Sequence, residues 1–298
     1  MRLVTRADLD GLTCAVLIKS CEPIEEIALI HPQDITDKRV AIGGKDILAN
    51  LPYHPGCAKW FDHHLLTQSN ERPPEVFDGR YGLAPSAARM VYEYYIPRHP
   101  EIQKFERLLA ETDRLDSAQL NIDDVLEPRE YILLGYTLDP RTGLGTFKDY
   151  FLQLVDWLKT LQIEEIMELP EVRERVARIR EQDERFRQVT VARSKLSGNV
   201  VFTDFRSEDK APVGNRFIVY TLYPQANISL RVHWGPNRNH VAAAVGHSIF
   251  NRTSRTNVGE LMSNYGGGGH RGAGTCLLPA DRAEGLIAEM IATMKKDG

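Results

Sequence analysis

The N-terminal stretch Leu3-Val4-Thr5-Arg6-Ala7-Asp8-Leu9-Asp10-Gly11 joins a short apolar run to a helical pattern through an acidic turn. The apolar run covers 2–5, and the helical pattern covers 12–21. Further short apolar runs at 27–31, 47–51 and 58–61 are separated by turns that contain Pro or Gly. Because short strands and helices alternate in this way in βαβ units, the pattern predicts an α/β fold with a parallel sheet.

The 298 residues predict two domains, at roughly 150 residues per domain. Apolar positions recur at helical spacing over 85–113, with breaks at Pro97 and Pro100, and again around 151–161. The charge-rich stretch 171–196 predicts one long helix with a single packed apolar stripe, rather than a coiled coil. The stripe consists of Val172, Val176, Ile179, Phe186 and Val189. We therefore expect an α/β domain at 1–170 that is joined by a helical linker at 171–198 to a second domain.

Residues 199–298 predict a smaller α+β domain. Apolar runs indicate strands at 200–205, 217–223, 228–234 and 241–245, and helical patterns follow at 258–264 and 280–294. Strands that follow one another closely in the chain favour a meandering sheet.

The overall composition is that of a soluble globular protein, with 42% hydrophobic and 26% charged residues. No apolar run approaches the roughly 18 to 20 residues of a membrane span, and Asp8 and Asp10 interrupt any N-terminal signal, so we expect a cytoplasmic protein without membrane contact. Four cysteines without a CxxC pair exclude a disulfide framework and a cysteine zinc site.

The charge distribution differs between the two halves of the chain. The net charge of −4 and the pI of about 6.2 argue against a groove for duplex DNA, which needs a strong basic excess. Residues 200–298 hold 11 Lys and Arg against 8 Asp and Glu, which leaves 26 against 33 for 1–199. The acidic half suits a cation, and the basic half suits an anion.

Two clusters of polar side chains follow predicted strands of the first domain. Asp8 and Asp10 lie at the end of the first strand, where a hard cation such as Mn²⁺ or Mg²⁺ binds in parallel α/β sheets, although Asp is also an ordinary turn and cap residue. Asp62-His63-His64 follows the strand at 58–61 and should emerge at the same edge. Imidazole is a common metal ligand and a neighbouring carboxylate fixes its tautomer, although two adjacent His also occur in loops by chance.

The glycine run Gly266-Gly267-Gly268-Gly269-His270-Arg271-Gly272-Ala273-Gly274 lies near the C-terminus. It matches G-x-G-x-x-G formally, but it follows a helix and leads into a strand, the reverse of the dinucleotide-binding context. A Walker A loop would need Lys where Ala273 stands. Two interpretations remain, which are a flexible loop and a run of backbone N–H groups that binds an anion beside His270 and Arg271.

Taken together, D-x-D-G, D-H-H and G-G-G-G-H-x-x-A-G resemble the motifs of the DHH/DHHA1 phosphoesterase family, over essentially the whole chain. The lengths are similar to the branch of short-oligonucleotide nucleases and exopolyphosphatase-related proteins. The resemblance implies an N-terminal DHH-type domain with two Mn²⁺ ions, a DHHA1-type domain that binds substrate phosphates, and hydrolysis by a metal-activated hydroxide. The implied substrates are short single-stranded oligoribonucleotides, pAp, cyclic dinucleotides or polyphosphate.

The resemblance also assigns roles to individual residues. It implies metal ligation by Asp8, Asp10, His63 and Asp113, and a substrate-facing or catalytic role for His64, with Asp62 beside it. It further implies that the second domain binds phosphate through the following residues: Gly267, Gly268, Gly269, His270 and Arg252.

Two positions depart from the family pattern. Arg6 stands where this branch has a metal-binding His, and Asn50 stands where a bridging Asp is usual, while Asp46 comes too early to replace it. With Arg6 counted, the carboxylates at 8, 10 and 113 sum to −2, which one divalent ion balances. A guanidinium can hold Asp8 or a phosphate in the catalytic centre, but it cannot lower the pKa of a bound water to about 7 as a metal does.

The sequence therefore leaves three functions open. The first is a phosphoesterase that uses one or two Mn²⁺ or Mg²⁺ ions on small phosphorylated nucleotides, with a degenerate metal site at Arg6 and Asn50. The second is a catalytically impaired nucleotide- or phosphate-binding protein, and the third is a phosphoanhydride hydrolase of the exopolyphosphatase type. A homodimer is compatible with the sequence.

Overall fold

The computed structural model describes residues 1–64, 66, 71–138 and 147–298. The chain divides into two compact units, which are described separately. The first contains 1–119 and 128–177, and the second contains 120–127 and 178–298. The first boundary predicted from the sequence, at residue 170, lies close to the start of helix α9, Pro170–Arg193, and the change of unit falls within this helix.

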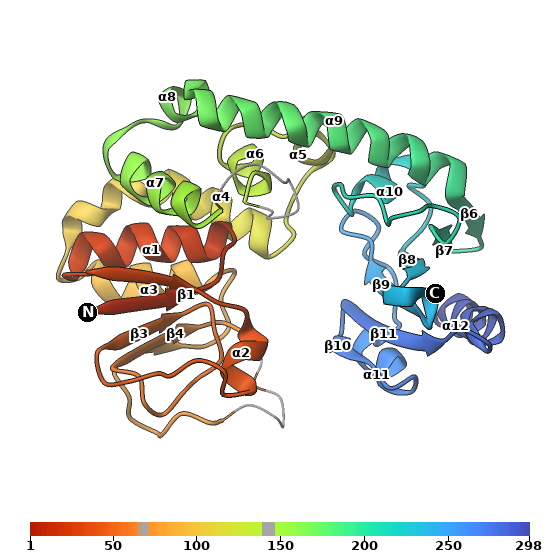
Figure 1. Ribbon diagram of the computed structural model, residues 1–298, viewed down its shortest axis with the longest axis horizontal. Coiled ribbons are helices and arrows are strands. Elements are labelled where there is room, and N and C mark those ends of the chain that lie inside the picture. The colour runs from red at the N-terminus through yellow and green to blue at the C-terminus, as the bar shows by residue number, and fades with distance from the viewer. Residues whose placement is uncertain (65, 67–70, 139–146) are drawn as a thin grey trace. The chain divides into compact units, whose positions relative to one another are not determined.

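The first unit is built on a five-stranded sheet of order β2-β1-β3-β4-β5, in which every neighbouring pair is parallel (Figure 1). The strands are β1 Arg2–Thr5, β2 Glu26–Leu29, β3 Asp46–Ala49, β4 Lys59–Asp62 and β5 Gly79–Tyr81. From β1 the chain passes to β2, which lies on one side of β1, and then to β3, which lies on the other side of β1. The point where strand order reverses therefore lies between β1 and β3, which is where ligands bind in parallel sheets. The predicted α/β class and parallel sheet are confirmed.

The helices of the first unit are short apart from those that pack around α1. They are α1 Leu9–Cys21, α2 Pro32–Thr36, α3 Ala87–Tyr95, the 3₁₀ helix η1 Pro100–Phe105, α4 Glu106–Asp116, α6 Glu130–Tyr136, α7 Phe147–Thr160 and α8 Ile163–Glu168. Helix α1 is buried from Leu9 to Ile18 because α3, α4 and α7 all contact it. On the opposite face of the sheet, Val4, Leu48 and Trp60 pack with Ile35 of α2. The sheet is thus covered on both faces, as its nearly continuous apolar strands require.

The second unit has a six-stranded mixed sheet of order β10-β11-β9-β8-β7-β6. Its strands are β6 Ser194–Ser197, β7 Val200–Asp204, β8 Ile228–Trp234, β9 His240–His247, β10 Gly268–His270 and β11 Ala273–Pro279. Its helices are α5 Ile122–Leu126, α10 Ile218–Leu222, the 3₁₀ helix η3 Pro236–Arg238, α11 Val258–Ser263 and α12 Ala283–Asp297. The buried core consists of alternate residues of β8 and β9 with apolar residues of α11 and α12. The α+β class expected for this domain is confirmed.

The stretch 217–223 is a helix and not the strand that its apolar run predicts. A short run of apolar residues fits a strand or a buried helix equally well. Here β7 and β8 pair in parallel, and a parallel pair needs a crossover connection, which contains α10. Val219 and Tyr220 of α10 pack against Val201 of β7, and the Tyr220 hydroxyl donates to the carbonyl oxygen of Gly246 at 2.6 Å. The sheet is consequently not a simple meander.

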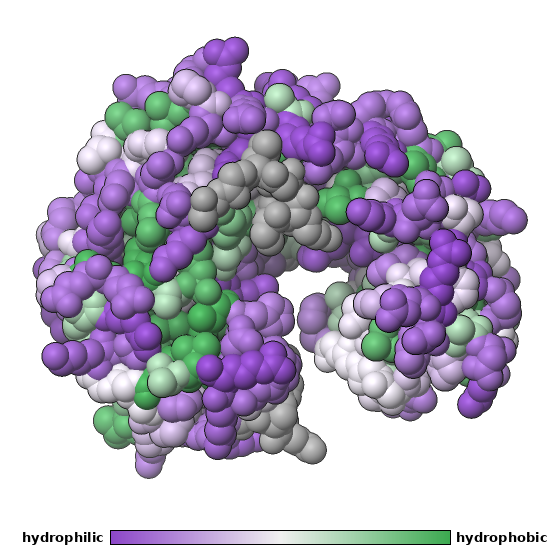
Figure 2. Space-filling model, viewed as in Figure 1, coloured by the Kyte–Doolittle hydropathy of each residue, from purple (hydrophilic) through white to green (hydrophobic). Residues whose placement is uncertain are grey.

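Helix α9 has one packed apolar side, as its sequence predicts, and its exposed residues are mostly charged. Val172, Val176, Ile179 and Phe186 are buried, while Figure 2 shows a hydrophilic surface where Figure 1 places the helix. The helix ends at Arg193, three residues before the predicted end, because residues 194–197 form β6 and pair with β7 through a turn at Gly198. In the described part of the chain, no helix is both long enough and apolar enough to cross a membrane.

Candidate metal centre

The polar motifs of the first unit meet at the carboxyl edge of the parallel sheet. Thr5, Ala49 and Phe61 lie side by side near the ends of β1, β3 and β4. The acidic turn directly follows β1, Asn50 directly follows β3, and the Asp-His-His run begins with the last residue of β4. The expectation that the two motifs share one edge of the sheet therefore agrees with the strand register.

His63 lies between two carboxylates at this edge. Its Nε2 atom is 3.1 Å from Oδ2 of Asp116 and 3.8 Å from Oδ2 of Asp10. Its Nδ1 atom is 3.0 Å from the carbonyl oxygen of Ala84, to which it donates in the tautomer that leaves Nε2 with a lone pair. The geometry of the Asp116 contact does not make a hydrogen bond, so among the described residues the buried Nε2 atom has no hydrogen-bond partner. Two carboxylate oxygens and one imidazole nitrogen within 4.8 Å of one another are a donor set that fits a divalent ion.

Asp10 is held rigidly by the start of helix α3. Its side chain is fully buried, and its two carboxylate oxygens accept from the backbone N–H groups of Ala87 at 2.9 Å and Ala88 at 2.7 Å. Burial raises its pKa well above the usual value, and the neighbouring charges of Asp116 and Asp8 raise it further. For His63, burial alone would lower the pKa, but Asp116 and Asp10 together raise it to about 9. The site therefore carries excess negative charge, which a bound cation would offset.

Asp62 organises the two histidines that follow it. Its buried Oδ1 atom accepts from the backbone N–H of His63 at 2.9 Å and lies 2.8 Å from Nδ1 of His64. This contact with Asp62 fixes the His64 ring at Nδ1. The side chain is 49% exposed, so Nε2 remains the ring atom available to a ligand. Asp62, His63 and His64 together form a second group with metal-ligand spacing.

The carboxylate of Asp8 is bound by other residues of the protein. As the N-cap of α1, its Oδ1 atom accepts from the backbone N–H of Gly11 at 2.9 Å and from Nδ2 of Asn50 at 3.0 Å. Its Oδ2 atom lies 3.2 Å from Nε of Arg6. Burial raises the pKa of Asp8, and the charge of Arg6 partly opposes that shift. Arg6 and Asn50 therefore both bind the carboxylate that follows β1.

The glycine run of the second unit forms the edge hairpin β10–β11. A Cβ atom on Gly267 would come within 2.1 Å of the carbonyl oxygen of Thr275, and one on Gly269 within 2.2 Å of that of Ala273. A Cβ atom on Gly268 would meet no atom within 4 Å. At two of these positions glycine is thus required by close backbone packing, whereas Gly268 presents a bare backbone outward. The Nδ1 atom of exposed His270 accepts from the N–H of Gly272 at 3.2 Å, and Arg252 is also exposed.

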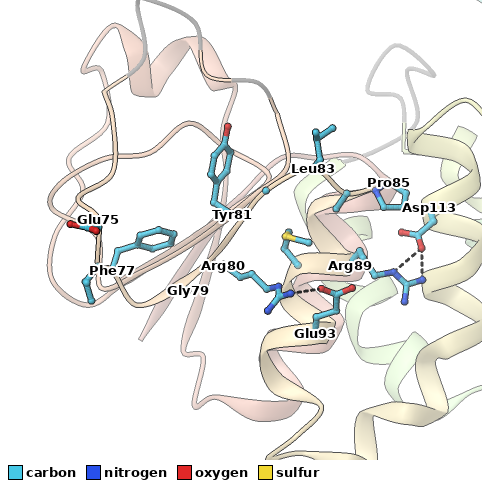
Figure 3. Close-up of a pocket in the computed structure, with 14 residues that line it drawn as sticks. Glu75, Phe77, Gly79, Arg80, Tyr81, Leu83, Pro85, Arg89, Glu93 and Asp113 are labelled. Atoms are coloured by element: carbon cyan, nitrogen blue, oxygen red, sulfur yellow. Dashed lines mark hydrogen bonds and ion pairs between the residues drawn. The ribbon is translucent and has the colours of Figure 1, made fainter.

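A pocket of about 860 Å³ in the first unit (Figure 3) lies beside the group formed by Asp10, His63 and Asp116, which we call the metal-ligand cluster. Its wall includes Ala84, whose carbonyl oxygen contacts His63, and Asp113, which lies one helical turn before Asp116 on α4. Two ion pairs, Arg80–Glu93 and Arg89–Asp113, lie in this wall.

Comparison with known proteins relates this architecture to solved structures. The pGpG-specific phosphodiesterase PggH from Vibrio cholerae matches with 40% identity and a TM-score of 0.85, over 100% of this chain and 99% of that chain. The chain belongs to the DHH/DHHA1 phosphoesterase family. No family model and no curated protein sequence matches it.

More distant DHH proteins share the fold. The DHH domain of a member of the s1p family of ribosomal proteins matches with a TM-score of 0.59 and 13% identity, over 99% of this chain and 86% of that chain. RecJ from Thermus thermophilus in complex with Mn²⁺ matches with a TM-score of 0.57 and 13% identity, over 99% of this chain and 52% of that chain.

Asp116, and not Asp113, joins Asp10 and His63 in this DHH protein. Asp113 accepts from the hydroxyl of Ser86, the N-cap of α3, at 2.6 Å and from Nε of Arg89 on α3 at 2.9 Å. Asp116 was not among the metal ligands expected from the sequence. The helical spacing could have indicated Asp116. Residues three apart lie on neighbouring parts of one helix face, so either Asp113 or Asp116 could point to the sheet edge.

Proposed function

We propose that the chain is a divalent-metal-dependent phosphodiesterase that cleaves pGpG and similar short nucleotides into mononucleotides. The observation that carries the proposal is the buried Nε2 atom of His63, held toward the carboxylates of Asp10 and Asp116. The activity named for the 40% identical PggH supports the substrate class.

Asp10, Asp116 and His63 would hold the metal ion. Mn²⁺ or Mg²⁺ bound there would supply a Lewis acid and would lower the pKa of a coordinated water toward neutrality. The complexes of RecJ with Mn²⁺ support this choice of ion. Ala84 fixes the tautomer of His63 through its carbonyl oxygen, and the first residues of α3 fix Asp10.

His64 would contact the substrate phosphate. Asp62 holds its Nδ1 atom, so the half-exposed ring presents Nε2 to the phosphoryl oxygen or the leaving group. In the second unit, the outward backbone of Gly268, between Gly267 and Gly269, would bind a phosphate together with the exposed side chains of His270 and Arg252. A backbone without a Cβ atom lets an anion approach N–H groups closely.

The charge balance favours one tightly held ion. Asp10 and Asp116 carry −2 in total, while Arg6 neutralises Asp8 and Asn50 is uncharged. The same Arg6–Asp8 pair favours a second candidate function, a nucleotide-binding protein in which hydrolysis is lost. Polyphosphate, which the sequence also suggests as a substrate, is included among the compounds tested below.

The test is anion-exchange chromatography of products from pGpG, pApA, pAp, cyclic di-GMP and polyphosphate with Mn²⁺. We expect GMP from pGpG, and turnover reduced at least a hundredfold in His63→Ala and Asp116→Asn, with circular dichroism showing that both variants fold. Cleavage of polyphosphate alone would reassign the substrate. No turnover of any substrate by folded protein, accompanied by retained nucleotide binding, would establish the second candidate instead.

A further inference from the structure

The wall of the pocket beside the metal-ligand cluster contains several charged side chains, and its positive and negative charges nearly balance. Arg80 on β5 and Glu93 on α3 point toward one another, with Nη2 of Arg80 2.9 Å from Oε2 of Glu93 (Figure 3). Arg89 on α3 and Asp113 on α4 form a second pair deeper in the wall. Each cation in this wall is thus matched by a carboxylate, which disfavours a phosphate, because a phosphate needs a positive excess.

Each pair belongs to the lining of the pocket and keeps hydrogen-bonding capacity that the pair itself does not use. Within the described residues, Glu93 uses Oε2 for Arg80 and leaves Oε1 without a hydrogen bond, and its side chain is 40% exposed. Arg89 donates to Asp113 through Nε and Nη2, and its Nη1 makes no hydrogen bond to any described residue. The wall therefore offers a fixed carboxylate acceptor and a fixed guanidinium donor, together with the apolar side chains of Leu83 and Met90.

This combination matches guanine among the common bases. Guanine carries two adjacent donors, N1–H and the N2 amino group, on one edge and two acceptors, O6 and N7, on the other. A carboxylate accepts from the donor edge, and an Arg donates to the acceptor edge. Adenine has an unprotonated N1 at the corresponding position, so it would place a lone pair against the carboxylate.

We propose that this pocket is a guanine subsite in which Glu93 selects the base and Arg89, positioned by Asp113, supports the opposite edge. The inference rests on the proposed function, because it deepens the specificity of the same site. The pocket adjoins the metal-ligand cluster. In its wall, Asp113 precedes the cluster residue Asp116 by one helical turn, and Ala84 contacts His63. A guanine held here would keep its own phosphate at the metal end of the pocket.

The test measures binding separately from hydrolysis. The dissociation constants of GMP, IMP and AMP are determined by isothermal titration calorimetry for the full chain and for Glu93→Gln. We expect a preference for GMP over AMP of roughly tenfold, as hydrogen bonds to charged groups confer. IMP, which lacks the N2 amino group, should bind with intermediate affinity. Glu93→Gln should reduce the GMP preference to within about threefold.

A matched control is available in the same pocket. Glu75 also lines it, but Figure 3 shows this carboxylate at the far end from Glu93, so Glu75→Gln should keep the full preference for GMP. An unchanged preference in Glu93→Gln, or equal binding of GMP and AMP by the unmodified chain, would overturn the inference.

Relative turnover of pGpG and pApA by the same variants distinguishes the two proposals. A preference for GMP that depends on Glu93, without turnover of either dinucleotide, would refute the phosphodiesterase and support the subsite. Turnover of pGpG and pApA at a ratio that Glu93→Gln does not change would support the enzyme and refute the subsite.

Discussion

The Nε2 atom of His63 lies 3.1 Å from the Oδ2 atom of Asp116, whereas the carboxylate of Asp113, one turn earlier on the same helix, is bonded to Arg89. The two acidic side chains of α4 thus have different surroundings, because Arg89 of the neighbouring helix α3 binds Asp113. One faces the sheet edge and the metal-ligand cluster, and the other fixes a cation in the pocket wall.

The first prediction contrasts these two carboxylates. Asp116→Asn should weaken Mn²⁺ binding by about a hundredfold or more, because an amide replaces one of two anionic ligands. Asp113→Asn should leave the Mn²⁺ dissociation constant within about threefold, since Asp113 is not part of the cluster. Isothermal titration of the metal-free protein with Mn²⁺ measures both values. A larger loss in Asp113→Asn would mean that Asp113 is the metal ligand.

The second prediction concerns the number of ions. In the Arg6→His/Asn50→Asp double variant, a neutral imidazole and a new carboxylate would flank Asp8, where a guanidinium and an amide now bind it. We expect the stoichiometry of Mn²⁺ to rise from one to two tight sites per chain. Equilibrium dialysis with metal analysis counts the ions. Two equivalent tight sites in the unmodified chain would contradict the single-ion balance.

The third prediction separates structural from binding glycines. Gly268→Ala should leave the free energy of unfolding nearly unchanged, because its Cβ atom would meet open space, yet raise the KM for pGpG by hindering a close phosphate approach. Gly267→Ala should destabilise the protein by about 2 kcal/mol or more, because its Cβ atom would overlap the carbonyl oxygen of Thr275. Urea unfolding and steady-state kinetics report the two effects. An unchanged KM in Gly268→Ala would remove the main support for a phosphate at this turn.

The fourth prediction is a pH-dependent contribution to stability. Burial alone would raise the pKa of Asp46, but hydrogen bonds from Arg2 and from the N–H of Gly43 lower it below its usual value. A lowered pKa stabilises the fold above the unfolded-state value of about 4, and this contribution is lost as the pH falls through the native pKa. Asp46→Asn should therefore cost about 1 kcal/mol at pH 7 and progressively less below pH 4. Urea titrations at several pH values test this, and a cost independent of pH would contradict it.

The shared sheet edge could be predicted from the sequence because strand ends follow from local apolar runs, and the carboxyl ends of parallel strands meet at one edge. Once Arg2–Thr5 and Lys59–Asp62 are parallel strands, the residues that follow them must emerge together. That Asp10 and His63 lie at the same edge follows from this relation, whereas their exact positions also depend on contacts with Ala84, Ala87 and Ala88.

The identity of the third cluster residue could not be predicted in the same way. Asp113 and Asp116 have the same chemistry and lie on one helix. The difference between them arises from Ser86, the N-cap of α3, and Arg89 on α3, which both contact Asp113. Helix α10 was missed for a related reason. Its apolar residues suit a strand as well as a helix, and the parallel pairing of β7 with β8 determines the connection between them.

The hydrogen bonds from Ala87 and Ala88 to Asp10 have a consequence for how such proteins lose activity during evolution. Replacement of Asp10 would leave two buried N–H groups at the start of α3 unsatisfied, and each such group costs about 1–3 kcal/mol. Selection for folding alone would therefore retain Asp10 in a descendant that no longer hydrolyses anything, whereas the partly exposed Asp116 would be less constrained. In diverged relatives, the presence of this aspartate is accordingly poor evidence of catalysis, and the pair His63–Asp116 is the more informative marker.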